Sequence, residues 1–154
     1  MRCLTKIELD DAGLPPPTPE IEQERKVALF DLLEENAFSP VGAPDGPYHL
    51  FLSIQDRRLV FDVRSEGDDA VGAFHLSLSP FRQVIKDYFQ ICEAYFEAVK
   101  RLPPAQIEAI DMGRRGIHDE GSRILAERLE GKVVTDHATA RRLFTLICVL
   151  HFKG

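Results

Sequence analysis

The segment that decides the fold is Phe81-Arg-Gln-Val-Ile-Lys-Asp-Tyr-Phe-Gln-Ile-Cys-Glu-Ala-Tyr-Phe-Glu-Ala-Val-Lys-Arg101. Its apolar residues recur at spacings of three and four, which predicts an amphipathic helix with one face against a core. Ser79-Pro80 supplies an N-cap and a first helical residue, and Pro103-Pro104 ends the helix. Because the apolar face is broad, a dimer seam or the wall of a ligand cavity stays open beside the core interpretation.

The residues before this helix predict a sheet. Three runs place alternate apolar residues on one face, and Asp56-Arg57 lies at the turn between the first two, which predicts an antiparallel meander. The expected elements are a strand at 2–9, a helix from Thr18 and Pro19 to about Asn36, a loop at 38–47, and strands at 48–55, 58–64 and 71–78.

The residues after it predict helices. We expect a short helix at 104–112, another at 117–130, a brief extended piece at Val133-Val134, and a strongly hydrophobic helix at 138–152 capped by Asp136. Strands cluster before residue 79 and helices after it, which argues against alternating βαβ units. The sequence therefore predicts one α+β domain over residues 1–154, with a small antiparallel sheet packed by the long amphipathic helix and by the hydrophobic C-terminal helix.

The composition excludes several classes of protein. With 25 acidic against 19 basic residues and a net charge of −6, the chain gives no support for general nucleic-acid or anionic-membrane binding, although a local basic patch remains open. Three cysteines without CxxC spacing indicate neither a disulfide framework nor a zinc site. No signal peptide or membrane span is apparent, so we expect a soluble, unexported, cytoplasmic protein.

The segment from Asp111 to Glu120 concentrates charge and glycine between the expected helices. Gly116 with Gly113 permits a turn that aims free helix amides at one point, and Arg114 and Arg115 supply two guanidiniums beside them. This pattern predicts a phosphate or carboxylate site. The alternative is a plain turn followed by a solvated first helical turn.

Two histidines each lie at or beside the expected start of a helix. His118 and His137 have acidic sequence neighbours, and either side chain can act as an acid or base near neutral pH. If the last helix packs beside its predecessor, both would share one pocket with Arg141 and Arg142. No HxxxH, HExxH or HxxE pair is present, so we expect no metal site and no cofactor.

Three segments near the C-terminus carry a family resemblance. They are Gly113-Arg-Arg-Gly-Ile-His-Asp-Glu-Gly-Ser, Leu129-Glu-Gly-Lys-Val, and Thr139-Ala-Arg-Arg-Leu-Phe-Thr-Leu-Ile-Cys-Val-Leu-His. With the N-terminal Ile-Glu-Leu-Asp-Asp strand, the chain resembles uncharacterised protein family 0262, a group of small bacterial proteins. The resemblance brings no activity, so it assigns no catalytic residue.

These observations favour a non-enzymatic binding or interaction protein that recognises a small anionic ligand through Arg114 and Arg115. The alternative is a small hydrolase or transferase for a phosphorylated or carboxylated substrate, with His118 as acid or base and Arg142 helping to hold the anion. A third interpretation is docking on a protein partner through the acidic helix from Glu20 to Glu35. Surplus apolar residues on the 81–101 and 138–152 helices also predict a homodimer.

Overall fold

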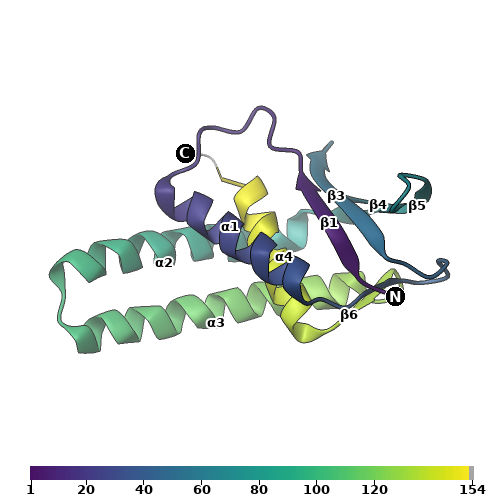
Figure 1. The fold of residues 1–154 in the computed structure, drawn as a ribbon. Helices are drawn as coiled ribbons and strands as arrows, with labels where there is room; N and C mark the ends of the chain where they lie inside the picture. The colour runs from purple at the N-terminus through teal and green to yellow at the C-terminus, as the bar shows by residue number, and fades with distance from the viewer. Residues whose placement is uncertain (153–154) are drawn as a thin grey trace.

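The computed structural model describes residues 1–152 (Figure 1), and residues 153 and 154 of the expected domain lie outside the described residues. The predicted α+β class is confirmed: a sheet occupies one side of the molecule and helices the other. The strands are β1 (Leu4–Leu9), β2 (Phe38–Pro40), β3 (Tyr48–Gln55), β4 (Arg58–Ser65), β5 (Ala70–Ser77) and β6 (Val133–Thr135). The helices are α1 (Pro19–Glu34), the short 3-10 helix η1 (Ser79–Phe81), α2 (Arg82–Arg101), α3 (Pro104–Leu129) and α4 (His137–Leu150).

The main sheet has the strand order β1-β3-β4-β5 and is mixed rather than wholly antiparallel. β3, β4 and β5 form the predicted antiparallel meander, whereas β1 pairs parallel with β3. The parallel pairing follows from α1, which lies between these two strands in the chain and acts as their crossover. The expected loop at 38–47 begins with a strand, because β2 pairs antiparallel with β6.

Side chains cap two helices where the sequence predicts. Thr18 Oγ1 accepts from the Ile21 amide at 3.2 Å, and Asp136 Oδ1 accepts from the Thr139 amide at 2.8 Å. Each bond satisfies a donor that the first helical turn leaves free. Together they fix the beginnings of α1 and α4.

The predicted break between helices at 112 and 117 is wrong, because α3 is one continuous helix of 26 residues. Two of its glycines lie where neighbouring helices pack closely. A Cβ built at Gly113 would lie 2.9 Å from Ile91 Cδ1, and one at Gly121 would lie 2.0 Å from Phe144 Cζ. Close approach of α2 and α4 therefore offsets the helix-propensity cost of about 1 kcal/mol per glycine. Gly116 faces open space instead.

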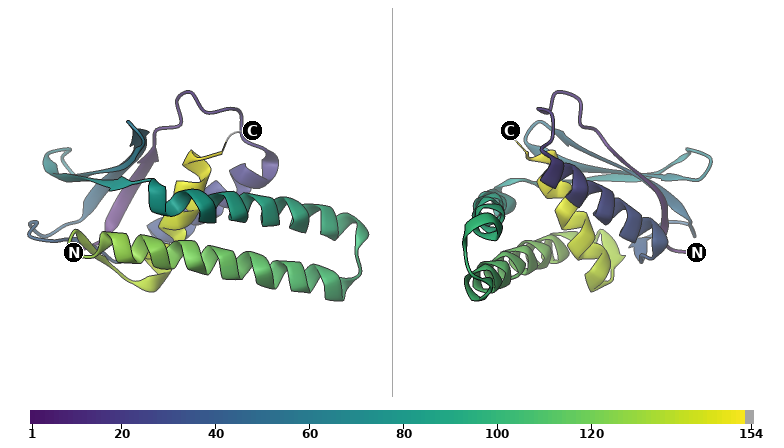
Figure 2. Two further views of the ribbon diagram at one scale, coloured as in Figure 1. Left: turned by 180° about the vertical axis from the view of Figure 1, so that it is seen from behind. Right: turned by 60° about the vertical axis from the view of Figure 1, so that its left-hand side comes forward.

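Helix α4 lies in the middle of the molecule, in contact with α1 on one side and α3 on the other. Its apolar residues enter the core cluster, as the hydrophobic pattern predicts, and so do Phe81, Val84 and Ile85 near the start of the long helix. Beyond that start, α2 runs along α3, and the two project away from the sheet as a hairpin (Figure 2).

Candidate functional site

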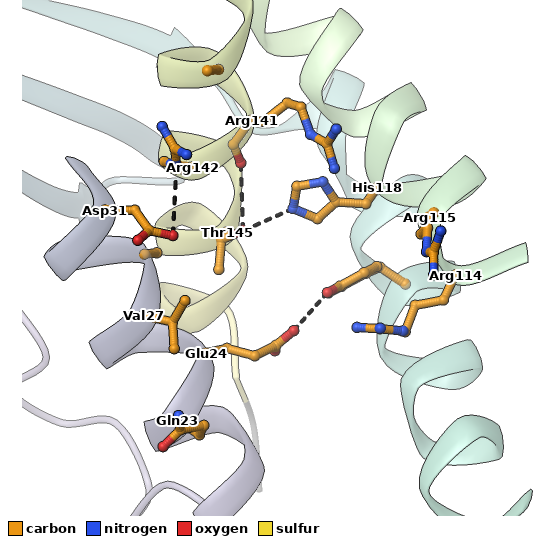
Figure 3. A pocket seen from close by; sticks show the side chains of 13 residues that line it. Gln23, Glu24, Val27, Asp31, Arg114, Arg115, His118, Arg141, Arg142 and Thr145 are labelled. Atoms are coloured by element: carbon orange, nitrogen blue, oxygen red, sulfur yellow. Dashed lines mark hydrogen bonds and ion pairs between the residues drawn. The ribbon is translucent and has the colours of Figure 1, made fainter. Parts of the chain in front are cut away.

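A pocket of about 590 Å³ lies between α1, α3 and α4, with Tyr88 contributed by α2 (Figure 3). Volumes of this size are usual for small-molecule sites. The lining residues are Gln23, Glu24, Val27, Ala28 and Asp31 from α1; Tyr88 from α2; Arg114, Arg115 and His118 from α3; and Ala138, Arg141, Arg142 and Thr145 from α4. The concave arrangement is compatible with a binding protein and with an enzyme.

The structure places four of the six predicted site residues on this pocket: Arg114, Arg115, His118 and Arg142. The other two, Gly116 and His137, do not line it. Gly116 is exposed in the middle of α3, and His137 is exposed at the first residue of α4.

Sequence reasoning missed the wall formed by α1 and the contribution of Thr145. A usable signal was present, because polar residues four apart share one helix face. Arg114 and His118 have this spacing, as do Arg141 and Thr145. The positions of Glu24 and Asp31 depend on the packing of α1 against α4, which no local pattern reveals.

Arg114 and Arg115 are both bound to Asp111, one turn earlier on α3. Arg114 donates to Asp111 Oδ1 from Nε at 3.1 Å and from Nη2 at 2.6 Å, and Arg115 Nη2 donates to Oδ2 at 2.6 Å. The Arg114 hydrogen bond, helped by Arg115, lowers the pKa of Asp111. Arg114 also lies over the Tyr95 ring, with 4.7 Å between its Cζ and the ring centroid. These contacts fix the direction of both guanidiniums.

Arg141 and Arg142 are held more loosely. Arg141 Nη1 lies 3.6 Å from Asp119 Oδ1, and Arg142 Nε lies 3.8 Å from Asp31 Oδ2. Both separations exceed hydrogen-bond length, so these pairs are electrostatic contacts without a directed bond. The two guanidiniums therefore keep their donors available to a ligand.

His118 reaches across from α3 to α4. Its Nε2 lies 2.8 Å from Thr145 Oγ1, and the Thr145 hydroxyl donates to the Arg141 carbonyl at 3.4 Å. Because the Thr145 hydroxyl gives its own proton to this carbonyl, Nε2 of His118 carries the imidazole proton and donates to Thr145 Oγ1. Nδ1 is then unprotonated and carries a lone pair. Nδ1 is buried and has no hydrogen-bond partner within residues 1–152. Burial, followed by the charge of Arg141, lowers the pKa of His118 to about 4.

The pKa values of Tyr88 and Cys92 reflect their burial in the interior beside the pocket. The Tyr88 hydroxyl donates to Glu24 Oε1 at 2.6 Å and so joins α2 to α1. Burial, reinforced by the Glu24 charge, raises the pKa of Tyr88 well above its usual value. Burial likewise raises the pKa of the Cys92 thiol to about 11. Since the thiolate is the reactive form, Cys92 is an inert core residue, as its position in the apolar stripe predicts.

None of the helices within residues 1–152 has both the length and the apolar character needed to cross a membrane.

The whole chain is similar to known proteins of one family. The uncharacterised protein family UPF0262 matches residues 1–153. A UPF0262 protein of Ruegeria sp. strain TM1040 is 69% identical over 159 residues, and one of Roseobacter denitrificans is 68% identical over 161, each covering 100% of both chains. A UPF0262 protein of Cereibacter sphaeroides strain ATCC 17025 is 67% identical over 157 residues, covering 99% of both. No solved structure matches the chain. By coverage and identity, the chain belongs to the uncharacterised protein family UPF0262.

Proposed function

We propose that this protein binds a small ligand through a phosphate or carboxylate group in the pocket between α1, α3 and α4. The observation that carries the proposal is the presence of four guanidiniums on one pocket, two from α3 and two from α4. Guanidinium forks match the geometry of carboxylate and phosphate oxygens. Arg141 and Arg142, which make only long ion pairs, are the groups expected to bind the anion directly.

The anion is expected to bind to arginine side chains, and not to the free helix amides that the sequence suggested. Because α3 is continuous, the amides near Ile117 lie inside a helix rather than at its start. The arginines remain on the pocket because Arg114 and His118 share a face of α3 that is turned toward α4. The site therefore depends on the packing of α3 against α4.

The opposite wall indicates the rest of the ligand. On α1, Glu24 and Asp31 carry negative charge, and Val27 and Ala28 between them are apolar. An anionic group near α1 would be repelled by these carboxylates, whereas a hydrogen-bond donor or a small apolar group would be accommodated. We therefore propose a ligand with its anionic end toward α4 and a neutral or donor end toward α1.

The chemistry of His118 favours binding over acid–base catalysis. An efficient general acid or base at neutral pH has a pKa near 7. The pKa of His118 is lowered to about 4, and its Nε2 proton is engaged by Thr145. A neutral imidazole whose one proton is engaged in this way has none left to donate to a ligand, so it is a poor proton carrier. The hydrolase or transferase alternative is therefore the weaker candidate.

The test is a phosphate titration followed residue by residue. We expect saturable chemical-shift changes at the His118 and Thr145 amides, and a rise in thermal stability that approaches about 2.7 kcal/mol at 100 times the dissociation constant. The double substitution Arg141→Gln with Arg142→Gln should abolish the changes at these amides.

Arg123→Gln is the matched control, because Arg123 is an exposed arginine of α3 that does not line the pocket. It should leave the titration unaltered. The proposal fails if neither phosphate nor acetate produces saturable changes at His118 and Thr145 in the wild-type protein.

A further inference from the structure

A second pocket, of about 520 Å³, lies where the β3–β4 turn and the end of β5 meet the start of α2. Its lining residues are Asp56, Arg57, Arg58, His75, Ser77, Ser79 and Arg82. It shares none of these residues with the first pocket. Strand β5 leads directly through η1 into α2, so the sheet and the helix contribute to it from adjacent segments (Figure 2).

The guanidiniums of this pocket have no partners among the described residues. Within residues 1–152, Arg57, Arg58 and Arg82 make no ion pair and no side-chain hydrogen bond, whereas each arginine of the first pocket has a carboxylate within 4.0 Å. Asp56 is the single carboxylate of the lining. Three guanidiniums against one carboxylate leave two positive charges on one concave surface of a chain whose net charge is −6. Two charges match a phosphate dianion better than a carboxylate monoanion.

Strand register brings further donors to the same place. Arg58 lies opposite Ser77 in the β4–β5 ladder, and His75 lies two residues before Ser77 on the same face of β5. Ser77 Oγ accepts from the Ser79 amide at 3.3 Å, which leaves the Ser77 hydroxyl proton free to donate. Hydroxyl donors between guanidiniums are typical of phosphate sites.

The β3–β4 turn favours a functional role for Arg57. Asp56 and Arg57 have φ of 52° and 62°, the left-handed conformation that a two-residue hairpin of this kind requires at both central positions. Glycine is the usual second residue of such a turn, because a side chain is strained there. An arginine is strained at that position, and within residues 1–152 the Arg57 side chain makes no ion pair or hydrogen bond that offsets the strain. Strain of this kind is characteristic of functional positions.

We infer that this second pocket binds a phosphate dianion, either free or as the terminal group of a small organic phosphate, through Arg57, Arg58 and Arg82. The inference is independent of the proposed function, because the two sites share no residue. In this inference, Arg57, Arg58 and Arg82 form the local basic patch that the acidic composition of the chain leaves open.

The experiment is an NMR titration of the full chain with three probes: inorganic phosphate, phenyl phosphate and acetate. We expect saturable shifts at the Arg58 and Ser77 amides with both phosphates and much weaker shifts with acetate. Arg58→Gln and Arg82→Gln should each weaken phosphate binding about tenfold, the usual effect of losing one charged hydrogen bond. Arg64→Gln is the matched control, since Arg64 lies on the same strand, is bonded to Asp62 and does not line the pocket.

Arg57→Gly separates binding from folding. Glycine adopts positive φ without strain, so this variant should be at least as stable as the wild type and yet bind phosphate more weakly. The inference is overturned if Arg57→Gly binds phosphate with unchanged affinity, or if acetate binds as tightly as phosphate. It is also overturned if the Arg58 and Ser77 amides do not respond to either phosphate.

The double variant Arg141→Gln with Arg142→Gln distinguishes the two sites. It should lose the response at His118 and keep the response at Ser77. A simultaneous loss at both places would contradict the second site, because the pockets have no lining residue in common.

Discussion

The ring of Phe144 occupies the space that a side chain at Gly121 would need, since a Cβ there would lie 2.0 Å from Phe144 Cζ. The same ring meets the imidazole of His118 edge-on, with centroids 5.2 Å apart. Phe144 is fully buried, so it cannot move aside into solvent. The close approach at Gly121 thus sets the distance between α3 and α4 at which His118 reaches Thr145.

Two glycines of the same helix should therefore respond oppositely to alanine. Gly121→Ala should destabilise the protein by about 1–3 kcal/mol or more, the cost of overpacking a well-filled core. Gly116→Ala should stabilise it by about 1 kcal/mol, because Gly116 faces open space and alanine favours the helix. Urea unfolding measures both. Equal effects of the two substitutions would show that Phe144 does not pack on Gly121.

The unfolding free energy should fall on mild acidification because of His118. In the unfolded chain a histidine protonates near pH 6.5, whereas the pKa of folded His118 is about 4. Protons therefore favour the unfolded state between these values, and stability is lost as the pH falls from about 6.5 toward 4. The loss from this residue amounts to roughly 3 kcal/mol. His118→Gln should flatten the stability profile in that window, and parallel profiles for variant and wild type would refute this assignment.

An anion in the first pocket should raise the pKa of His118. Negative charge near the imidazole favours its protonated form and offsets the effect of Arg141, which contributes to the lowered value. The imidazole resonances of His118, titrated by NMR with and without saturating phosphate, would show the midpoint moving upward. Arg141→Gln with Arg142→Gln should remove the difference between the two titrations, and an unchanged midpoint in the wild type would place the anion elsewhere.

The long apolar stripe should divide energetically into two parts. Phe81 is fully buried, so Phe81→Ala should cost about 3–5 kcal/mol. Phe96, in the half of α2 that runs along α3, is only partly buried, and Phe96→Ala should cost less than about 3 kcal/mol. Urea titration of both variants checks the order, which would be reversed if the distal half of the hairpin were covered more completely than its base.

Self-association remains a prediction, and we now expect the contact between two copies to involve apolar residues of α1. The apolar residues of α4 are in the core, whereas Val27, Phe30 and Leu33 on α1 are 46%, 68% and 48% exposed. Light scattering at micromolar concentration should return twice the 17.4 kDa chain mass, and Phe30→Asp should lower that value. A wild-type mass near 17.4 kDa would exclude a tight dimer.

Local patterns predicted the elements well. Alternation located β3, β4 and β5, and the caps at Thr18 and Asp136 located two helices, because these signals are contained within a few neighbouring residues. The parallel pairing of β1 was not predictable in this way. It depends on a crossover through α1, and Asn36 supports it by bonding both the amide and the carbonyl of Leu4.

The glycines of α3 show where reasoning from the sequence failed. A glycine beside charged residues suggests a turn, and only the positions of Ile91 and Phe144 reveal that Gly113 and Gly121 serve close packing. The arginines and His118 were identified from their chemistry, but the α1 wall of the pocket required tertiary contacts. The sequence did not predict the second pocket, because Asp56-Arg57 indicated only a turn and the left-handed backbone conformation of these residues is seen in the structure alone.

Because α3 is one continuous helix, its two ends lie in different surroundings. At 1.5 Å per residue the helix is about 39 Å long. Its first turns lie in the projecting hairpin, and its last turns hold Leu125 and Leu129 in the core. Amide protons near residue 106 should exchange with solvent through local fraying, whereas those near residue 125 should exchange only when the whole protein unfolds. Arg114 and His118 lie between the part of α3 that frays and the part that stays protected. A ligand bound to them in the first pocket should therefore slow deuterium uptake toward the tip of the hairpin.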